Sequence, residues 1–121
     1  MSHNEDFLRL AAEARARIAE LSPARARELL AEGAVLIDVR DREELGADPP
    51  IAGALNISRG QLELKIADAV PDKDTPVLLY CGGGNRGALA TDALRQLGYT
   101  QVCNLQGGLR GWKKDGDAAK D

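Results

Sequence analysis

The chain has 121 residues, which is enough for one compact domain with a hydrophobic core and too few for two. Hydrophobic residues make up 44% and charged residues 29%, a composition typical of soluble globular proteins rather than disordered ones. The formal net charge of −3, with acidic and basic residues interspersed, excludes nucleic acid as a partner of the whole domain. Because the only histidine is His3, a Cys-His or Ser-His-Asp site would lack its base, and a zinc site would lack ligands.

No run of the sequence approaches the length of a membrane span, about 20 apolar residues, and the first residues lack the basic and apolar regions of a signal peptide. We therefore expect a cytoplasmic protein that does not bind a membrane. In that compartment Cys81 and Cys103 are expected to be reduced rather than paired, so each is a candidate reactive thiol or a core residue.

In chain order, the first predicted element is an amphipathic helix over residues 5–20, whose apolar residues are spaced by three and four. We interpret its apolar stripe as a cover for the domain's own core rather than as a dimer contact. A second helix is predicted to begin after Ser22, an N-cap residue followed by Pro23, and to end at Gly33.

Three apolar runs further along the chain predict strands buried on both faces of a parallel sheet: 34–38, 76–80 and, more weakly, 101–105. Between them, Ser58 and Gln61 form a capping-box signal for a third helix, and residues 86–97 predict a fourth. This alternation of strands and helices predicts an α/β fold with a mostly parallel sheet and right-handed crossovers.

The segment with the clearest chemical signal follows the strand at 76–80 and reads Cys81-Gly82-Gly83-Gly84-Asn85-Arg86-Gly87. Consecutive glycines weaken strands and helices, so they indicate special backbone torsions or a close backbone approach. A tight glycine loop that enters a helix turns its N–H groups inward and forms an anion-binding nest. With Cys81 at the mouth of this nest, the N–H groups, the helix dipole and Arg86 would stabilise a thiolate without any histidine. Cys103 has no glycine or cation beside it, which favours a core role.

Three other readings of this loop are weaker. Gly82, Gly84 and Gly87 match the dinucleotide-binding pattern, but the chain after them is too short for the second half of such a domain and offers no acidic ribose ligand. A nucleotide P-loop would require Gly-Lys-Ser/Thr, which is absent. A cysteine-dependent phosphatase or arsenate reductase loop of the form Cys-x5-Arg would place its arginine at 87, whereas Arg86 arrives one residue early.

Four motifs in order resemble a known family. They are LIDVR at 36–40 with Glu43 and Glu44 after it, IAGALNI at 51–57, CGGGNR at 81–86, and LQGG at 105–108 followed by Gly111-Trp112. Over about residues 22–114 the chain is similar to the single-domain rhodaneses, which are sulfurtransferases. The resemblance implies an α/β fold with a parallel five-stranded sheet flanked by helices on both faces. Residues 1–21 would then be an extra N-terminal helix and 115–121 a disordered tail, while Trp112 would help pack a C-terminal helix onto the sheet.

The family also implies a reaction. Cys81 would take a sulfane sulfur from a donor such as thiosulfate or a small persulfide and pass it to a thiol or cyanide, without a metal or cofactor. The N–H groups of residues 82–87 would stabilise the sulfur anion, and Arg86 would clamp the anionic donor. Asp38 would tie the loop to the neighbouring strand end. Arg40 and Arg59 would add charge near the site, with solvated surface arginines as the alternative.

The sequence departs from the family pattern at the entrance to the site. Gly82 and Gly83 replace residues that are basic in thiosulfate-selective relatives, and Gly87 replaces a serine common in others. With Arg86 as the only loop cation, we expect thiosulfate to be a poor donor and smaller or neutral persulfides to be preferred. A second function stays open: a low-turnover persulfide carrier or interaction module that serves an acceptor protein.

Overall fold

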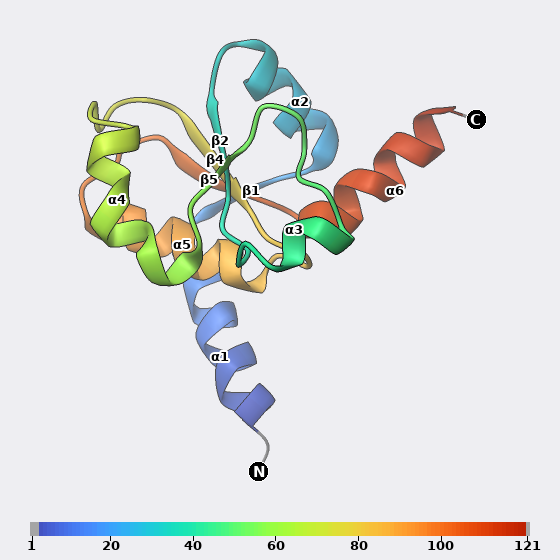
Figure 1. Cartoon of the computed structure of the whole chain (residues 1–121). Coiled ribbons are helices and arrows are strands. Elements are labelled where there is room, and N and C mark those ends of the chain that lie inside the picture. Colours follow the sequence, from blue (N-terminus) through green and yellow to red (C-terminus); the bar gives the residue numbers. More distant parts are fainter. Residues whose placement is uncertain (1–2, 121) are drawn as a thin grey trace.

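The computed structural model describes residues 3–120, which form one parallel five-stranded sheet with helices on both faces (Figure 1). The strand order is β1-β5-β4-β2-β3. The strands are β1 (Ala19–Leu21), β2 (Val35–Asp38), β3 (Leu55–Asn56), β4 (Val77–Tyr80) and β5 (Val102–Leu105). The helices are α1 (His3–Arg15), α2 (Pro23–Ala31), α3 (Glu44–Ala47), α4 (Leu62–Ala69), α5 (Asn85–Gln96) and α6 (Gly108–Lys120), with a single 3-10 turn η1 (Arg59–Gln61) before α4. The α/β fold predicted from the sequence is confirmed.

Each face of the sheet has its own core, because side chains alternate along the strands. Ile37 and Leu79 lie on the face covered by α4 and α5, where they pack with Leu62, Ile66 and Leu94. Their neighbours Leu36 and Leu78 lie on the other face, packed with side chains of α2 and α6. The central strand β4 is completely buried. This explains why the strands read as continuous apolar runs rather than as alternating ones.

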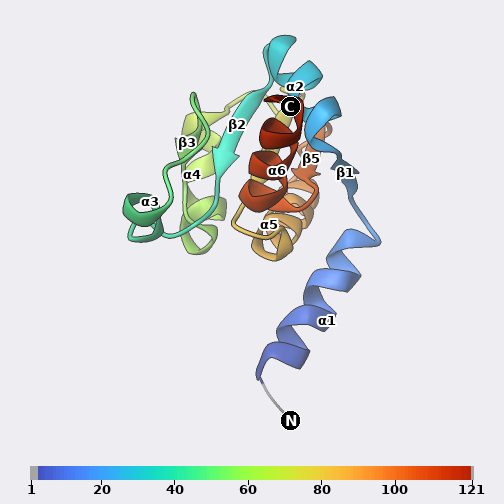
Figure 2. The same cartoon turned by 90° about the vertical axis from the view of Figure 1, so that its right-hand side faces the viewer.

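The N-terminal helix is shorter than the sequence predicts. The expected helix over 5–20 ends at Arg15, and Ala19–Leu21 instead form the edge strand β1, which pairs with β5. A strand this short leaves no periodic signal, and only its pairing with β5 defines it. Ala11 and Ala14 are completely buried where α1 packs against α5, so the intramolecular interpretation of the stripe is confirmed. Figure 2 shows α1 running away from the sheet toward the N-terminus.

The capping box expected at Ser58 and Gln61 is not formed. The Gln61 N–H donates to the backbone carbonyl of Ser58 at 2.9 Å, and the Ser58 side chain makes no capping bond. The cause is the chain's exit from β3, since the Arg59 N–H donates to the Val39 carbonyl at 2.9 Å and starts a 3-10 turn there. The helix itself forms, and its apolar residues Leu62 and Ile66 are buried. The other predicted cap is present, because Ser22 Oγ accepts the Arg25 N–H at 3.3 Å.

The tail predicted to be disordered from residue 115 continues as helix α6 to Lys120; Asp121 lies outside the described residues. Contacts with α2 explain the difference. The Arg27 guanidinium lies 3.9 Å from the centre of the Trp112 ring and also pairs with Asp115. Trp112 packs on the core beneath, as its predicted role requires.

The division of the chain into 1–21, 22–114 and 115–121 stays a prediction, although β1 belongs to the sheet. Within residues 3–120, no helix is long and apolar enough to cross a bilayer.

Candidate active site

The glycine loop lies at the carboxyl end of the central strand, between β4 and α5. This is the edge at which α/β sheets bind ligands. Cys81 directly follows β4 and is only 2% exposed, so its sulfur lies inside the loop rather than at the mouth. The sequence placed this cysteine in the correct loop but not at the correct depth.

Backbone N–H groups of the loop point at the cysteine sulfur. The Gly84 nitrogen lies 3.1 Å from Cys81 Sγ, and the Gly87 nitrogen lies 3.3 Å from it. Both donors sit where the loop becomes the first turn of α5, whose dipole also favours a negative charge. Of the N–H groups of residues 82–87 that were expected to face the sulfur, those of Gly84 and Gly87 do so. A thiolate or a persulfide would receive two N–H hydrogen bonds there without any basic side chain.

The loop carbonyls face outward because other elements bind them. The N–H groups of Leu109 and Arg110, at the start of α6, donate to the Cys81 and Gly82 carbonyls at 2.8 and 3.1 Å. Asn104 Nδ2, at the end of β5, donates to the Gly84 carbonyl at 3.1 Å. Three loop peptides are thus anchored from outside. This arrangement leaves the N–H groups of the loop free to face the sulfur.

Two glycine positions show why side chains are excluded here. Gly84 has φ +110°, a left-handed conformation that L side chains rarely adopt. A Cβ at Gly108, where φ is +60°, would lie 2.6 Å from the Cys81 carbonyl oxygen. Glycine at 108 is thus required for α6 to approach the loop backbone. Gly108 lies in one of the four motifs that resemble the family, and in the structure it packs against the cysteine loop.

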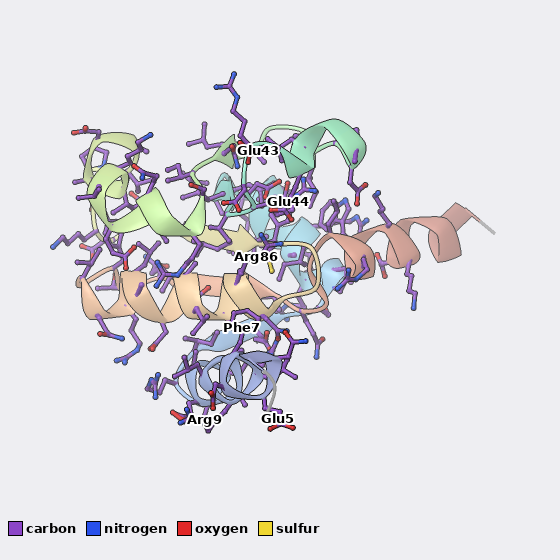
Figure 3. All side chains as sticks on the ribbon, turned by 60° about the horizontal axis from the view of Figure 1, so that its bottom comes forward. Glu5, Phe7, Arg9, Glu43, Glu44 and Arg86 are labelled. Carbon is purple, nitrogen blue, oxygen red and sulfur yellow. The ribbon has the colours of Figure 1, made fainter. Side chains whose placement is uncertain are left out.

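Arg86 is already paired. Its guanidinium makes two hydrogen bonds to the Glu44 carboxylate of α3, at 2.6 and 2.8 Å (Figure 3). The Arg86 side chain lowers the pKa of Glu44 to about 2, so this carboxylate is ionised under any physiological condition. Arg86 belongs to the loop as expected, but its guanidinium, predicted to clamp an anionic donor, is paired with the Glu44 carboxylate.

Arg86 is not the only cation at the loop, contrary to the sequence-based expectation. The Arg110 guanidinium occupies the space where a Gly83 side chain would be, and among the described residues it has no carboxylate partner. The Arg15 Nη2 atom, from the end of α1, lies 3.2 Å from the position of a Gly84 Cβ. Neither residue carried a sequence signal, because both approach the loop from segments distant in sequence.

Asp38 and Arg40 bind each other rather than the loop. The Asp38 carboxylate accepts hydrogen bonds from Arg40 at 2.7 to 3.1 Å, and both side chains are buried. Arg40 Nη1 also donates to the Asp48 carbonyl at 2.8 Å. The predicted tie from Asp38 to the glycine loop is therefore wrong. So is the alternative of a solvated Arg40, because burial next to Asp38 makes it a structural ion pair.

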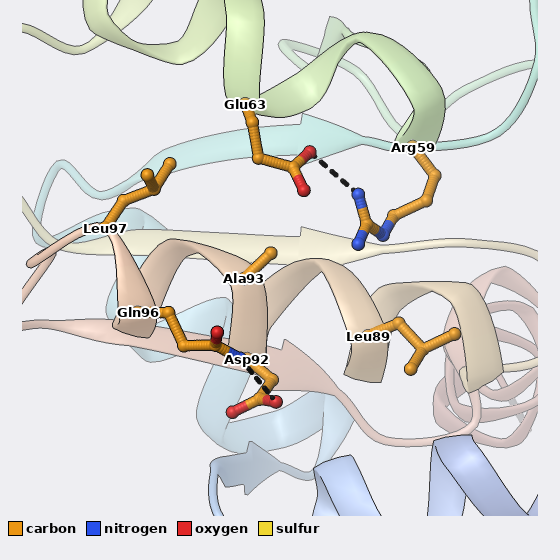
Figure 4. A pocket seen from close by; sticks show the side chains of 7 residues that line it. All are labelled: Arg59, Glu63, Leu89, Asp92, Ala93, Gln96 and Leu97. Atoms are coloured by element: carbon orange, nitrogen blue, oxygen red, sulfur yellow. Dashed lines mark hydrogen bonds and ion pairs between the residues drawn. The ribbon is translucent and has the colours of Figure 1, made fainter.

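Arg59 also lies away from the loop. Its Nη1 atom donates to Glu63 at 2.8 Å, and the side chain lines a hollow of about 280 Å³ beside α5 with Leu89, Ala93 and others (Figure 4). The Arg59 side chain contacts the surface between α4 and α5, so a solvated surface arginine is the better description. Nothing in its contacts supports the predicted role near the reaction.

Cys103 has the opposite surroundings to Cys81. It is buried among apolar side chains of the α2 and α6 face, 3.7 Å from the Val77 carbonyl. Burial raises the pKa of this thiol to about 11. The core role predicted for Cys103 is confirmed. Within residues 4–116 no group of His, Cys, Asp and Glu side chains is arranged to hold a metal ion.

This fold and loop have known counterparts. The family model described as "Rhodanese-like domain" matches residues 22–115. The thiosulfate sulfurtransferase PspE of Escherichia coli strain K12 is 40% identical over 74 residues, which cover 61% of this chain and 69% of that protein. Two solved structures are also similar. The polysulfide-sulfur transferase homodimer of Wolinella succinogenes has a TM-score of 0.77 and 36% identity, with 93% of this chain and 85% of that one covered.

The second structure is that of a Rhodopseudomonas palustris protein of unknown function, described as a possible tyrosine phosphatase. It has a TM-score of 0.83 and 30% identity, and the match covers 91% of this chain and 90% of that one. The architecture and the cysteine loop define an α/β protein with two N–H groups directed at the Cys81 sulfur at the end of its central strand. The chain belongs to the rhodanese-like domain family.

Proposed function

We propose that this protein is a sulfurtransferase in which Cys81 carries the sulfur. The Cys81 thiolate attacks the outer sulfur of a donor such as thiosulfate, and the sulfur–sulfur bond of the donor breaks. Sulfite leaves with the bonding electron pair, and a Cys81 persulfide anion remains. A second nucleophile, a thiolate or cyanide, then attacks the terminal sulfur and regenerates the Cys81 thiolate. Each half-reaction conserves charge and needs neither a proton donor nor an oxidant.

The observation that carries this proposal is the pair of N–H groups, of Gly84 and Gly87, directed at Cys81 Sγ at 3.1 and 3.3 Å. Both the resting thiolate and the persulfide are sulfur anions, so one preorganised nest serves both states. A phosphatase would need a wider ring of donors and an arginine free to hold the oxyanion. Here the loop is one residue shorter than the phosphatase pattern, and Arg86 is paired with Glu44.

The donor is proposed to be thiosulfate or a small persulfide. The expectation that thiosulfate is poor rested on Arg86 as the only loop cation, and that premise no longer holds. Arg110 offers a guanidinium over Gly83 that can receive the anionic end of a donor.

The acceptor is a thiol, and an acceptor protein stays a proposal. Two free, buried cysteines suit a reducing compartment, which supports a cytoplasmic location.

The test is intact mass spectrometry after incubation with thiosulfate and then with cyanide. We expect a gain of one sulfur on Cys81, its loss on cyanide with release of thiocyanate, and no gain in Cys81→Ala. Cys103→Ala is the matched control and should load sulfur as the wild type does. If glutathione persulfide and polysulfide also fail to load the wild-type protein, the proposal is overturned. Loading without turnover on small acceptors would instead support the persulfide carrier.

A further inference from the structure

The segment before the rhodanese-like domain reaches the cysteine loop. Arg15 ends α1 and Glu20 lies in β1, so both precede the residues matched by the family, which begin at 22. The segment is firmly attached to α5, because Arg17 binds the buried Asp92 carboxylate with hydrogen bonds of 2.8 to 3.2 Å. Independently of Arg17, the buried Ala11 and Ala14 pack α1 against α5, and Arg15 makes its own hydrogen bond to Asn85 at the start of α5, where the loop ends.

Four polar side chains form a continuous network on the outside of the loop. Arg15 Nη2 donates to Asn85 Oδ1 at 2.8 Å, and Arg15 Nε lies 3.4 Å from Glu20 Oε2. The same Glu20 oxygen accepts from Asn104 Nδ2 at 2.8 Å. Asn104 in turn donates to the Gly84 carbonyl. Glu20 therefore links two separate hydrogen-bonded contacts with the loop. Arg15 contacts the Asn85 side chain, and Asn104 contacts the Gly84 backbone.

One of the two held residues, Gly84, supplies an N–H group to the sulfur, and the other, Asn85, lies between it and the second donor, Gly87. Gly84 presents its carbonyl to Asn104 on the outside and its N–H to Cys81 Sγ on the inside. Residue 85 follows directly and begins α5. Gly84 has a left-handed conformation, and its carbonyl also accepts the Ala88 N–H at 3.0 Å. Loss of the Asn104 hydrogen bond would leave this residue with one carbonyl contact fewer, and we expect its N–H to shift relative to the sulfur.

We propose that Arg15 and Glu20 are positioning residues that hold the Cys81 loop in its sulfur-binding conformation. The segment before the domain then contributes to the active site by fixing the conformation of its loop. Its role is indirect, since neither residue is within hydrogen-bond distance of the sulfur. The inference rests on the proposed function for its consequence, whereas the geometry of the loop can be measured without sulfur transfer.

The test compares Arg15→Gln with two matched variants of the full chain. Arg9→Gln makes the same change on an exposed part of α1, and Arg17→Gln breaks the attachment to Asp92 without touching the loop. Two rates are measured: sulfur uptake from thiosulfate in a single turnover, and alkylation of Cys81 by iodoacetamide. We expect Arg15→Gln to slow both by about 10-fold, because the donors are displaced rather than removed. Arg9→Gln should change neither rate.

Arg17→Gln separates positioning from stability. It should lower the unfolding midpoint while leaving both Cys81 rates within twofold of wild type. A double-mutant cycle with Asn85→Ala identifies the route: if Arg15 acts through Asn85, the double variant should be no slower than the slower single variant. Wild-type rates in Arg15→Gln, or equal slowing by Arg17→Gln, would overturn the inference. Failure of the wild-type protein to take up sulfur would overturn the proposed function alone, since the alkylation rates still report on the loop.

Discussion

The two cysteines carry the same side chain but have different chemistry because their surroundings differ. Cys81 faces two N–H groups at the end of β4, whereas Cys103 is enclosed by apolar side chains that raise its pKa. The residues next to each cysteine in the sequence predicted that Cys81 is reactive and Cys103 is a core residue, because glycines follow Cys81 and strand residues flank Cys103. Arg86 illustrates the opposite case. Its place in the loop was predicted, but its pairing with Glu44 depends on a helix more than 40 residues away, since the two are separated by 42 positions.

Gly87 is predicted to be intolerant of any side chain. A Cβ there would collide with Asn104 Oδ1, and Asn104 is completely buried and held by two hydrogen bonds through its Nδ2. Gly87→Ala should therefore lower the free energy of unfolding by about 1–3 kcal/mol and slow sulfur uptake. Urea denaturation and single-turnover mass spectrometry measure the two effects. Gly60→Ala, which has open space at its Cβ position, is the control, and equal stability of the two variants would contradict the prediction.

Arg110 is predicted to bind the anionic end of the donor. Its guanidinium lies over the loop and has no carboxylate partner among the described residues. Arg110→Ala should raise the KM for thiosulfate about 10-fold with little change in kcat, as expected for loss of a charge-assisted contact made equally in the ground and transition states. Steady-state kinetics provide the measurement. Lys114→Ala removes the same charge one turn further along α6, and an effect of equal size there would exclude a specific role for Arg110.

At the scale of elements, the loop is shaped by its neighbours as much as by its own glycines. Helix α6 binds two of its carbonyls, β5 binds a third, and α3 holds Arg86. The apolar runs and the glycines that end helices predicted the alternation of helices and strands that brings these elements to the carboxyl edge of the sheet. The contacts themselves were not, because each joins segments that no local pattern links.

Substitution of Gly108 by alanine tests the contact between α6 and the cysteine loop. A Cβ at this position would press on the Cys81 and Gly82 carbonyls, and φ is also unfavourable for L residues. We expect Gly108→Ala to displace the loop and slow sulfur uptake by at least 10-fold. Gly116→Ala lies in the same helix with ordinary contact distances and should keep the wild-type rate. The same wild-type rate in Gly108→Ala would show that α6 does not set the loop geometry.

At the scale of the molecule, Asp92 binds the segment that follows α1 to the domain, through Arg17. It is buried on α5 and accepts hydrogen bonds from Arg17, Arg95 and Gln96. The Arg17 side chain is the main reason that the pKa of Asp92 lies below its usual value. A carboxylate with a lowered pKa contributes stability that is fully present above its unfolded pKa, about 3.9, and that is lost as the pH falls through the folded value.

Asp92→Asn should therefore lower the free energy of unfolding by about 1–3 kcal/mol at pH 7. The difference from wild type should shrink below about pH 3.9, where protonation removes the same charge from the wild-type protein. Urea denaturation at pH 7 and at pH 3 measures this. Asp68→Asn, on the exposed side of α4, should differ from wild type at neither pH. A constant difference for Asp92→Asn across this range would contradict the electrostatic explanation.

The sequence by itself determined the α/β class, the three buried strands, the helix boundaries at Ser22 and Gly33, and the cysteine loop. These features depend on local periodicity, on caps and on glycines, all of which are written in neighbouring residues. Only the tertiary structure decided the edge strand β1, the pairing of Asp38 with Arg40, and the contacts of Arg15 and Asn104 with the loop. Such contacts arise when the sheet brings distant segments to one edge, where burial and charge pairing select partners that sequence spacing does not reveal.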